Sequence, residues 1–477
     1  MIASSGGAPI ADVVQFDRTT TAIAEYAVGL DRTLISVSAR QTMTRRLIEA
    51  IGCALGAFEA KPCVSARGLA ASSTSNPGAS VFGLDSRSTP ELAVFANASM
   101  VRYLDFNDTY HTEGGGHPSD MMPAILAAAE VNDASGDAVL TAMHVAYEVF
   151  AALADAVPMR DKGWDYGGFL GIATAAGVGR VMGLDAAGVA NAVSIAVTPN
   201  MPLFVTRTGE LSNWKGCASA YASMAGLFAA RVTAAGISGP PMPFEGTFGV
   251  WDQITGPFEI ASLGSPVDGR SAVERTSCKL HPSDFETQIP AQVFIELHSE
   301  GIAPDDIAAI DIATYYVAWD LIGGGQGDHD EKWDPKRRET ADHSLPYLIA
   351  VALSDGEVTK SSFTPERVAD PALRPLMQRI SVVEDPEITR TWTTHPAYEF
   401  DIRLTNGDRR RIRVDHPRGH FRDPLTDDEV VAKFLANSRT VMTVSSAQEL
   451  LDMLWLVDGV PSINDIMRHL RSVGSDT

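Results

Sequence analysis

Four polar segments interrupt the apolar stretches of the sequence, and the first holds the groups best suited to proton transfer. It runs from Arg102 to Asp120 and contains Asp105, Thr109 and His117 together with three consecutive glycines. Carboxylates and histidines this close in sequence can exchange protons with a bound substrate, and glycines let the backbone approach closely. The segment predicts a cleft for acid–base chemistry. Helix-capping Asp and Thr residues beside a flexible glycine turn would give the same pattern.

The remaining polar segments add cations and a further histidine. They cover residues 207–216, 278–288 and 337–347. We expect Lys215 in the first turn of a helix, where a cation opposes the helix dipole, so a function for it is favoured over a solvent-exposed lysine. Lys279 lies where the helical part of the chain meets a mixed part, and such a junction is a usual place for a small-molecule site. His343 precedes a helix and either caps it or faces the same cleft.

No cofactor or metal is predicted. The four cysteines are far apart, at Cys53, Cys63, Cys217 and Cys278. Such spacing fits neither a disulfide framework nor a thiolate-held metal or iron–sulfur cluster. The sequence also lacks a P-loop, a G-x-S-x-G elbow and a complete dinucleotide fingerprint, which disfavours nucleotide-dependent and serine-hydrolase chemistry.

The composition favours a soluble protein of the cytoplasm. The chain has 477 residues and is 45% apolar, with 60 acidic against 38 basic residues and a net charge of −22. Such a surface repels nucleic acids and anionic membranes. Residues 1–17 lack the pattern of a targeting segment, and the longest apolar stretch, Gly167–Gly179, is too short to span a bilayer. The expected partner is a small molecule or a second copy of the chain.

Periodicity divides the chain into a helical part and an α+β part. Helical spacing and alanine-rich segments run from about 19 to 235. Residues 307–316 and 398–413 are β-rich, the second around an Asn-Gly turn, which predicts an antiparallel sheet. Helical patterns return from about 425, where Thr426 and Glu429 predict a capping box. We therefore expect a mainly α protein with an inserted α+β domain, divided as residues 1–271, 272–415 and 416–477. The alanine- and glycine-rich helices of 124–230 offer a flat surface for a homodimer.

The polar segments resemble, in order and spacing, the signatures of the MmgE/PrpD family. The matching strings are YLDFNDTY (103–110) with HPSD (117–120), GELS (209–212) with WKG (214–216), Pro282-x-x-Phe285-x-x-Gln288 after Lys279, RETADHSLPY (338–347) and PLTD (424–427). This resemblance implies a large helical domain, a smaller lid domain, a homodimer and a cofactor-free lyase. The cleft positions that it carries over are Asp105, Thr109, His117, Lys279, Lys215 and His343.

Within that family the sequence most resembles the branch that dehydrates 2-methylcitrate to 2-methyl-cis-aconitate in propionate catabolism. It departs from the family pattern at Asp165-Tyr166, Asp284 and Glu286, and by two extra glycines before His117. A cis-aconitate decarboxylase, an epimerase of iminodisuccinate or another dicarboxylate, and a non-catalytic relative are the alternatives. The last is disfavoured because the cleft residues are retained together.

The residue types fit dehydration of a hydroxy tricarboxylate. The reaction needs a base, an acid for the departing hydroxyl, and cations for the carboxylates. Asp105 and His117 are the acid–base candidates, with Thr109 as a hydrogen-bond donor, and which of the two removes the proton stays open. The candidate cations are Lys279, Lys215, Arg102 and Arg207.

Overall fold

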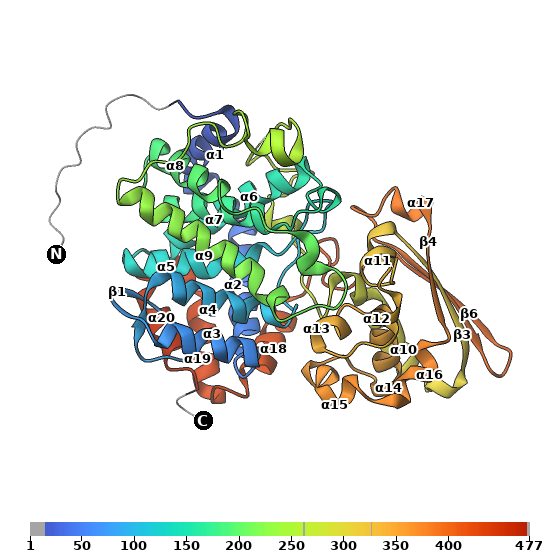
Figure 1. The fold of residues 1–477 in the computed structure, drawn as a ribbon. Coiled ribbons are helices and arrows are strands. Elements are labelled where there is room, and N and C mark those ends of the chain that lie inside the picture. Colours follow the sequence, from blue (N-terminus) through green and yellow to red (C-terminus); the bar gives the residue numbers. More distant parts are fainter. Residues whose placement is uncertain (1–14, 261–262, 326, 475–477) are drawn as a thin grey trace.

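Both ends of the chain build one large helical domain, and a smaller domain with a sheet lies beside it (Figure 1). The computed structural model describes residues 15–260, 263–325 and 327–474. Residues 1–14, which belong to the segment expected to lack a targeting signal, are outside the described part. The expectation of a mainly α protein with a smaller α+β domain is confirmed.

The large domain consists of helices from two parts of the chain. Its helices are α1 (Arg18–Gly29), α2 (Val37–Gly56), α3 (Lys61–Ala71), α4 (Pro90–Tyr103), α5 (Met122–Val131), α6 (Gly136–Ala156), α7 (Gly167–Val181), α8 (Ala186–Val197), α9 (Trp214–Ala234), α18 (Asp427–Ser438), α19 (Val444–Trp455) and α20 (Asn464–Arg471). A two-stranded ribbon of β1 (Thr74–Ser80) and β2 (Arg87–Ser88), which periodicity did not reveal, lies among them.

Small side chains let these helices pack closely. Helix α9 packs against both α4 and α7. A Cβ atom on Gly226 of α9 would lie 2.6 Å from the carbonyl oxygen of Gly171 in α7, so only glycine permits this approach. Helix α18 returns after the small domain to pack on α2, beginning at the predicted Thr426–Glu429 capping box. The alanine- and glycine-rich sequence thus explains the dense centre of the domain.

One helix of the described residues, α6, is long and apolar enough to cross a membrane. Its apolar window is 83% buried within the protein, as in a core helix. The sequence search for uninterrupted apolar residues selected part of α7 instead, because Glu148 interrupts the apolar run of α6.

The small domain is an α+β layer with a mixed sheet. It contains α10 (Gln288–Ser299), α11 (Tyr316–Leu321), α12 (His329–Trp333), α13 (Arg338–Ala341), α14 (Leu345–Asp355), α15 (Pro365–Val368), α16 (Arg374–Met377), α17 (Pro386–Thr389), β3 (Ile307–Thr314), β4 (Ile380–Glu384), β5 (Tyr398–Leu404) and β6 (Arg409–Val414). The strand order is β4-β3-β5-β6. The predicted β5–β6 hairpin is present, but β4 pairs parallel to β3, so the expectation of a purely antiparallel sheet is wrong. Helices α11 to α16 form the crossover that parallel pairing requires.

Each domain has its own hydrophobic core. The second core contains Phe294 of α10 packed on Phe400 of β5, and its residues run from Ile289 to Ile402. Ala272 and Cys278 pack in the first core instead. We therefore propose that the small domain begins near residue 281 rather than at 272, with the return to the large domain kept near 416.

A buried ammonium joins the two ends of the chain beneath the domain junction. Lys433 of α18 donates to the Glu49 carboxylate on α2 at 2.7 Å, and to the carbonyl oxygens of Phe106 at 2.9 Å and Lys279 at 2.8 Å. Lys433 is therefore a point of attachment for two loops that carry predicted site residues.

We expect Lys433→Met to lower the free energy of unfolding by about 3–5 kcal/mol, because it leaves the buried Glu49 carboxylate short of a counter-charge. Denaturant unfolding measures the change. The matched control is Lys336→Met, which removes an exposed lysine paired with Asp334 and should alter stability little. Equal stability of the two variants would contradict the prediction.

Candidate active site

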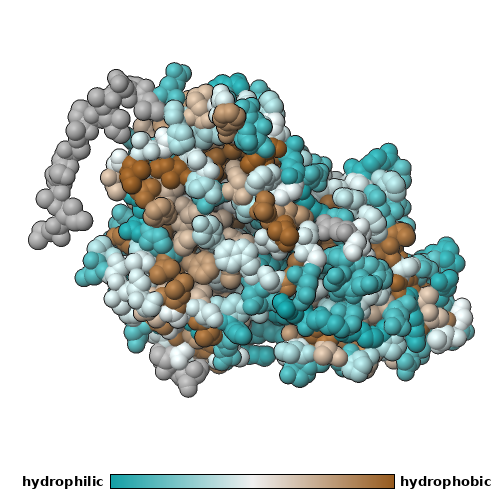
Figure 2. All heavy atoms as spheres, in the orientation of Figure 1, coloured by the Kyte–Doolittle hydropathy of each residue, from teal (hydrophilic) through white to brown (hydrophobic). Residues whose placement is uncertain are grey.

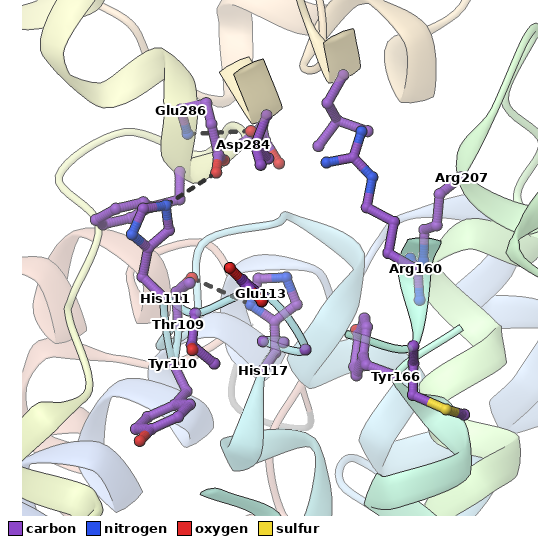
Figure 3. A pocket seen from close by; sticks show the side chains of 18 of the residues that line it. Thr109, Tyr110, His111, Glu113, His117, Arg160, Tyr166, Arg207, Asp284 and Glu286 are labelled. Carbon is purple, nitrogen blue, oxygen red and sulfur yellow. Dashed lines mark hydrogen bonds and ion pairs between the residues drawn. The ribbon is translucent and has the colours of Figure 1, made fainter. Parts of the chain in front are cut away.

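A cavity of about 130 Å³ lies between the two domains and is lined by both (Figure 3). Its polar and charged lining residues are Arg102, Thr109, Tyr110, His111, Thr112, Glu113, His117, Arg160, Tyr166, Arg207, Asp284, Glu286 and His343. In Figure 3, Asp284 and Glu286 face His117 across the space, and Arg160 and Arg207 lie together at one side.

The carboxylate of Asp105 is the centre of the charged groups beneath this cavity. It is fully buried at the end of α4 and lies 2.9 Å from Arg102 Nη1 and 3.2 Å from Lys215 Nζ. Lys279 Nζ pairs with Oδ1 and also donates to the Asp105 carbonyl oxygen at 3.0 Å. Three cations from three separate segments therefore converge on one carboxylate.

This arrangement keeps Asp105 ionised. Burial alone would raise its pKa, but Arg102, Lys279 and Lys215 hold the pKa well below its usual range. The residue has a φ of 52°, a left-handed conformation that aspartate tolerates better than most side chains. The backbone turn after α4 thus points the carboxylate toward the lysines. An acid this strong has no proton to donate near neutral pH, which argues against Asp105 as the acid.

His117 is held as a neutral base. Its Nδ1 lies 2.7 Å from the carbonyl oxygen of Asp108, which only accepts, so the ring proton sits on Nδ1. The Nε2 lone pair is then free, 3.8 Å from Asp105 Oδ1. Burial and the cations Arg102 and Lys279 keep the pKa of His117 well below its usual value. The ring therefore stays unprotonated at neutral pH.

The glycines before His117 are required by close contacts. A Cβ atom on Gly115 would lie 2.2 Å from the carbonyl oxygen of Tyr110, and one on Gly116 would lie 2.3 Å from the ring of Tyr166. Gly116 also accepts a backbone hydrogen bond from Tyr110 at 2.8 Å. The predicted close approach of the backbone is present, and it brings His117 beside Thr109, whose hydroxyl lies 3.2 Å from Nδ1.

Three arginines supply positive charge at the cavity wall. Arg207 donates to Asp165 at 2.7 Å and packs over the ring of Tyr166, while Arg160 pairs with Asp320 across the domain junction. Arg102 Nη1 is buried and, among the described residues, makes no hydrogen bond despite its ion pair with Asp105. An N–H group of this kind is ready to donate to a carboxylate in the cavity.

The small domain contributes a chain of titratable groups. His343 Nδ1 lies 2.8 Å from Asp342 Oδ1, and its Nε2 lies 3.2 Å from Asp284 Oδ2 and 3.5 Å from Asp105 Oδ2. Lys215 Nζ joins this chain to the large domain through Asp342 at 2.6 Å. The two domains therefore share one network of charges.

The structure brings all eight predicted residues together, but at two depths. Five line the cavity: Arg102, Thr109, His117, Arg207 and His343. Asp105, Lys215 and Lys279 are buried beneath them. We expected these last three to contact the substrate. None of them lines the cavity, because their charged groups pair with one another.

Sequence reasoning did not select Arg160, His111, Tyr166, Asp284 or Glu286 as site residues. Arg160 lies in a short loop of mixed charge with no motif, so its sequence carried no usable signal. His111 and Glu286, 3.1 Å apart, lie within the polar segments already noted. The sequence signal that could have selected His111 and Glu286 was their position within polar segments that converge on the cavity.

Three described side chains could hold a metal ion. Donor atoms of Asp105, Asp284 and His343 lie within 4.8 Å of one another. The Asp105 carboxylate already contacts the ammonium groups of Lys215 and Lys279, so a cation there would meet two positive charges at close range. The donor set fits a metal poorly, and a metal-free site stays our prediction.

Comparisons with known proteins agree with this two-domain arrangement. The MmgE/PrpD N-terminal domain matches residues 21–262, and the MmgE/PrpD C-terminal domain matches residues 281–458. The chain is 28% identical over 436 residues to 2-methylcitrate dehydratase of Cupriavidus necator, covering 85% of this chain and 86% of that protein.

Two further relatives cover most of the chain. 2-Methylcitrate dehydratase of Escherichia coli K12 is 27% identical over 470 residues, or 92% of this chain and 94% of that protein. Cis-aconitate decarboxylase of Mus musculus is 24% identical over 413 residues, or 83% of this chain and 82% of that protein. With both domain models matched across the described fold, the chain belongs to the MmgE/PrpD family.

Proposed function

We propose that the protein is a cofactor-independent hydro-lyase that dehydrates a hydroxy tricarboxylate, with 2-methylcitrate as the substrate and propionate catabolism as the setting. The observation that carries this proposal is a neutral imidazole nitrogen of His117 facing a cavity whose wall holds Arg102, Arg160 and Arg207. The names of the dehydratase relatives support the substrate.

In this proposal His117 removes the proton. Its Nε2 takes a weakly acidic proton from the carbon next to a substrate carboxylate. Arg102 Nη1, which makes no hydrogen bond to the described residues, stabilises the charge that develops there. Thr109 hydrogen-bonds within the same wall. The three residues beneath the cavity, Asp105, Lys215 and Lys279, act as positioning residues. Their ion pairs hold Arg102, His117 and His343 in place but do not reach the cavity.

The charge balance favours an anionic substrate. Arg102, Lys215 and Lys279 contact the Asp105 carboxylate, and Lys215 also contacts Asp342. Three cations therefore face two carboxylates beneath the cavity, although the whole chain carries a net charge of −22. Positive groups in a buried site attract carboxylates more strongly than the same groups in water do. A small tri- or dicarboxylate is therefore the proposed partner, and the cytoplasm the proposed compartment.

We expect dehydration of 2-methylcitrate, followed as ultraviolet absorbance of the conjugated product, after dialysis against a strong chelator. Citrate and a series of hydroxy dicarboxylates serve as comparison substrates. Loss of activity that added iron restores would contradict the metal-free proposal. Release of carbon dioxide from cis-aconitate, without dehydration, would replace the hydro-lyase by a decarboxylase like the mouse relative.

His117→Ala should lower kcat by about 100- to 10,000-fold, the usual contribution of a general base. Steady-state kinetics and circular dichroism of the folded variant measure this. His329→Ala is the matched control, since His329 is an exposed histidine of α12 stacked on Trp333 and should leave kcat unchanged. A near-normal kcat for His117→Ala would remove this residue from the chemistry.

We also propose a homodimer with its interface on the large domain. Trp214, Tyr221 and Phe228 recur every seven residues along α9 and are 48%, 46% and 52% exposed. Hydrophobic side chains gather on this face of the large domain, whereas the small domain surface is mostly hydrophilic (Figure 2). Contiguous exposed apolar residues of this size are typical of an interaction surface.

Phe228→Glu should convert the dimer into a monomer, because it places a charge within the apolar stripe. Light scattering at micromolar concentration measures the mass. The control is Val383→Glu, at an exposed apolar position of β4 in the small domain, which should keep the mass of the dimer. A monomer mass for the unaltered protein would refute the dimer.

A further inference from the structure

Asp284 is a carboxyl group of the small domain that lines the cavity. It precedes the short 3₁₀ turn Phe285–Thr287, and its Oδ1 accepts the backbone N–H of Glu286 at 3.0 Å. This bond fixes the side chain, which is 6% exposed and stands opposite His117 in Figure 3. One oxygen is thus held by the backbone, and the other lies 3.2 Å from His343 Nε2.

Nδ1 of His343 has two close partners. It lies 2.8 Å from Asp342 Oδ1, which accepts, and 3.0 Å from Lys215 Nζ, which donates. Lys215 keeps the pKa of Asp342 below its usual value against the effect of burial. Asp342 and Lys215 together hold the ring so that its Nε2 faces Asp284.

The surroundings of Asp284 favour its protonated form. Burial, reinforced by the nearby Glu286 carboxylate, raises the pKa of Asp284 to about 7. Burial and Lys215 lower the pKa of His343. The charged and titratable groups around Asp284 are Glu286, His343, Asp105, His111, Lys332, Tyr315 and Tyr398. Both shifts favour a neutral pair with the proton on Asp284.

We propose that Asp284 is the general acid of this site and that Asp342 and His343 form the relay that positions its proton. This inference rests on the proposed dehydration. His117 takes the proton from carbon, the electron pair left there forms the C=C bond, and the C–O bond breaks. The oxygen leaves as water with the proton of Asp284. Asp284 regains a proton and His117 loses one to solvent before the next turnover.

The roles of the acid, Asp284, and the base, His117, can be distinguished with a substrate whose leaving group needs no proton. Fluoride leaves as an anion, so the analogue with fluorine in place of the tertiary hydroxyl requires His117 but not Asp284. We expect Asp284→Asn to lower kcat for the hydroxy substrate by at least about 100-fold and to lower fluoride release by less than about tenfold. His117→Ala should lower both reactions by at least about 100-fold.

The pH profile gives a second test of the same role. In the unaltered enzyme kcat should fall tenfold per pH unit above about 7, because only protonated Asp284 can donate. Asp284→Asn removes this limb, and Asp284→Glu restores part of the rate together with a basic limb. Equal losses for the hydroxy and fluoro substrates in Asp284→Asn, or an unchanged basic limb, would overturn the assignment.

Infrared spectroscopy tests the proton without any turnover, so it stands even if the proposed substrate is wrong. A protonated-carboxyl band should disappear as the pH rises through about 7. Because burial also raises the pKa of Asp120 to about 7, the band belongs to Asp284 only if Asp284→Asn removes it. An identical band in Asp284→Asn would overturn the proposal. If the unaltered protein shows the Asp284 band but does not dehydrate 2-methylcitrate, only the proposed function is overturned.

Discussion

The arrangement of the site depends on one buried carboxylate. Arg102, Lys215 and Lys279 come from three segments, and without Asp105 their charges would repel one another in a region that water does not reach. The same carboxylate lies within 3.8 Å of His117 and 3.5 Å of His343. Asp105 therefore positions two of the imidazoles that line the cavity, although it does not line the cavity itself.

This constraint also joins the two domains. Lys215 of α9 bridges Asp105 of the large domain to Asp342 of the small domain, and Arg160 pairs with Asp320 across the same junction. Beneath them, Lys433 ties the carbonyl oxygens of Phe106 and Lys279 to Glu49. The site is complete only when both domains are in contact, since each contributes groups that the other neutralises.

The two walls of the cavity have different chemical characters. The large domain presents guanidinium groups and an imidazole whose tautomer is fixed by the Asp108 carbonyl. The small domain presents carboxyl groups, two of which are bonded to histidines. Burial lowers the pKa of His117 and raises that of Asp284, which favours an unprotonated imidazole on one wall and a protonated carboxyl on the other.

The local sequence determined the elements and the segments that carry the chemistry. Alanine-rich periodicity predicted the helices. Asn406-Gly407 predicted the hairpin between β5 and β6, and Thr426 with Glu429 predicted the start of α18. These features depend on neighbours within a few residues, so they can be recognised without the fold. The four polar segments that break the apolar periodicity all meet at the cavity.

Only the tertiary structure decided the depth and partners of each charged group. Lys215 and Asp342 are separated by 127 residues, and Lys279 and Asp105 by 174, so their ion pairs follow from domain packing and leave no local pattern. The same packing places Arg160 in the cavity wall and Lys279 beneath the cavity, and it pairs β4 parallel to β3. Residue types and spacing thus identified the candidate chemistry. Long-range packing determined the burial and the neighbours of each group, which shift its pKa.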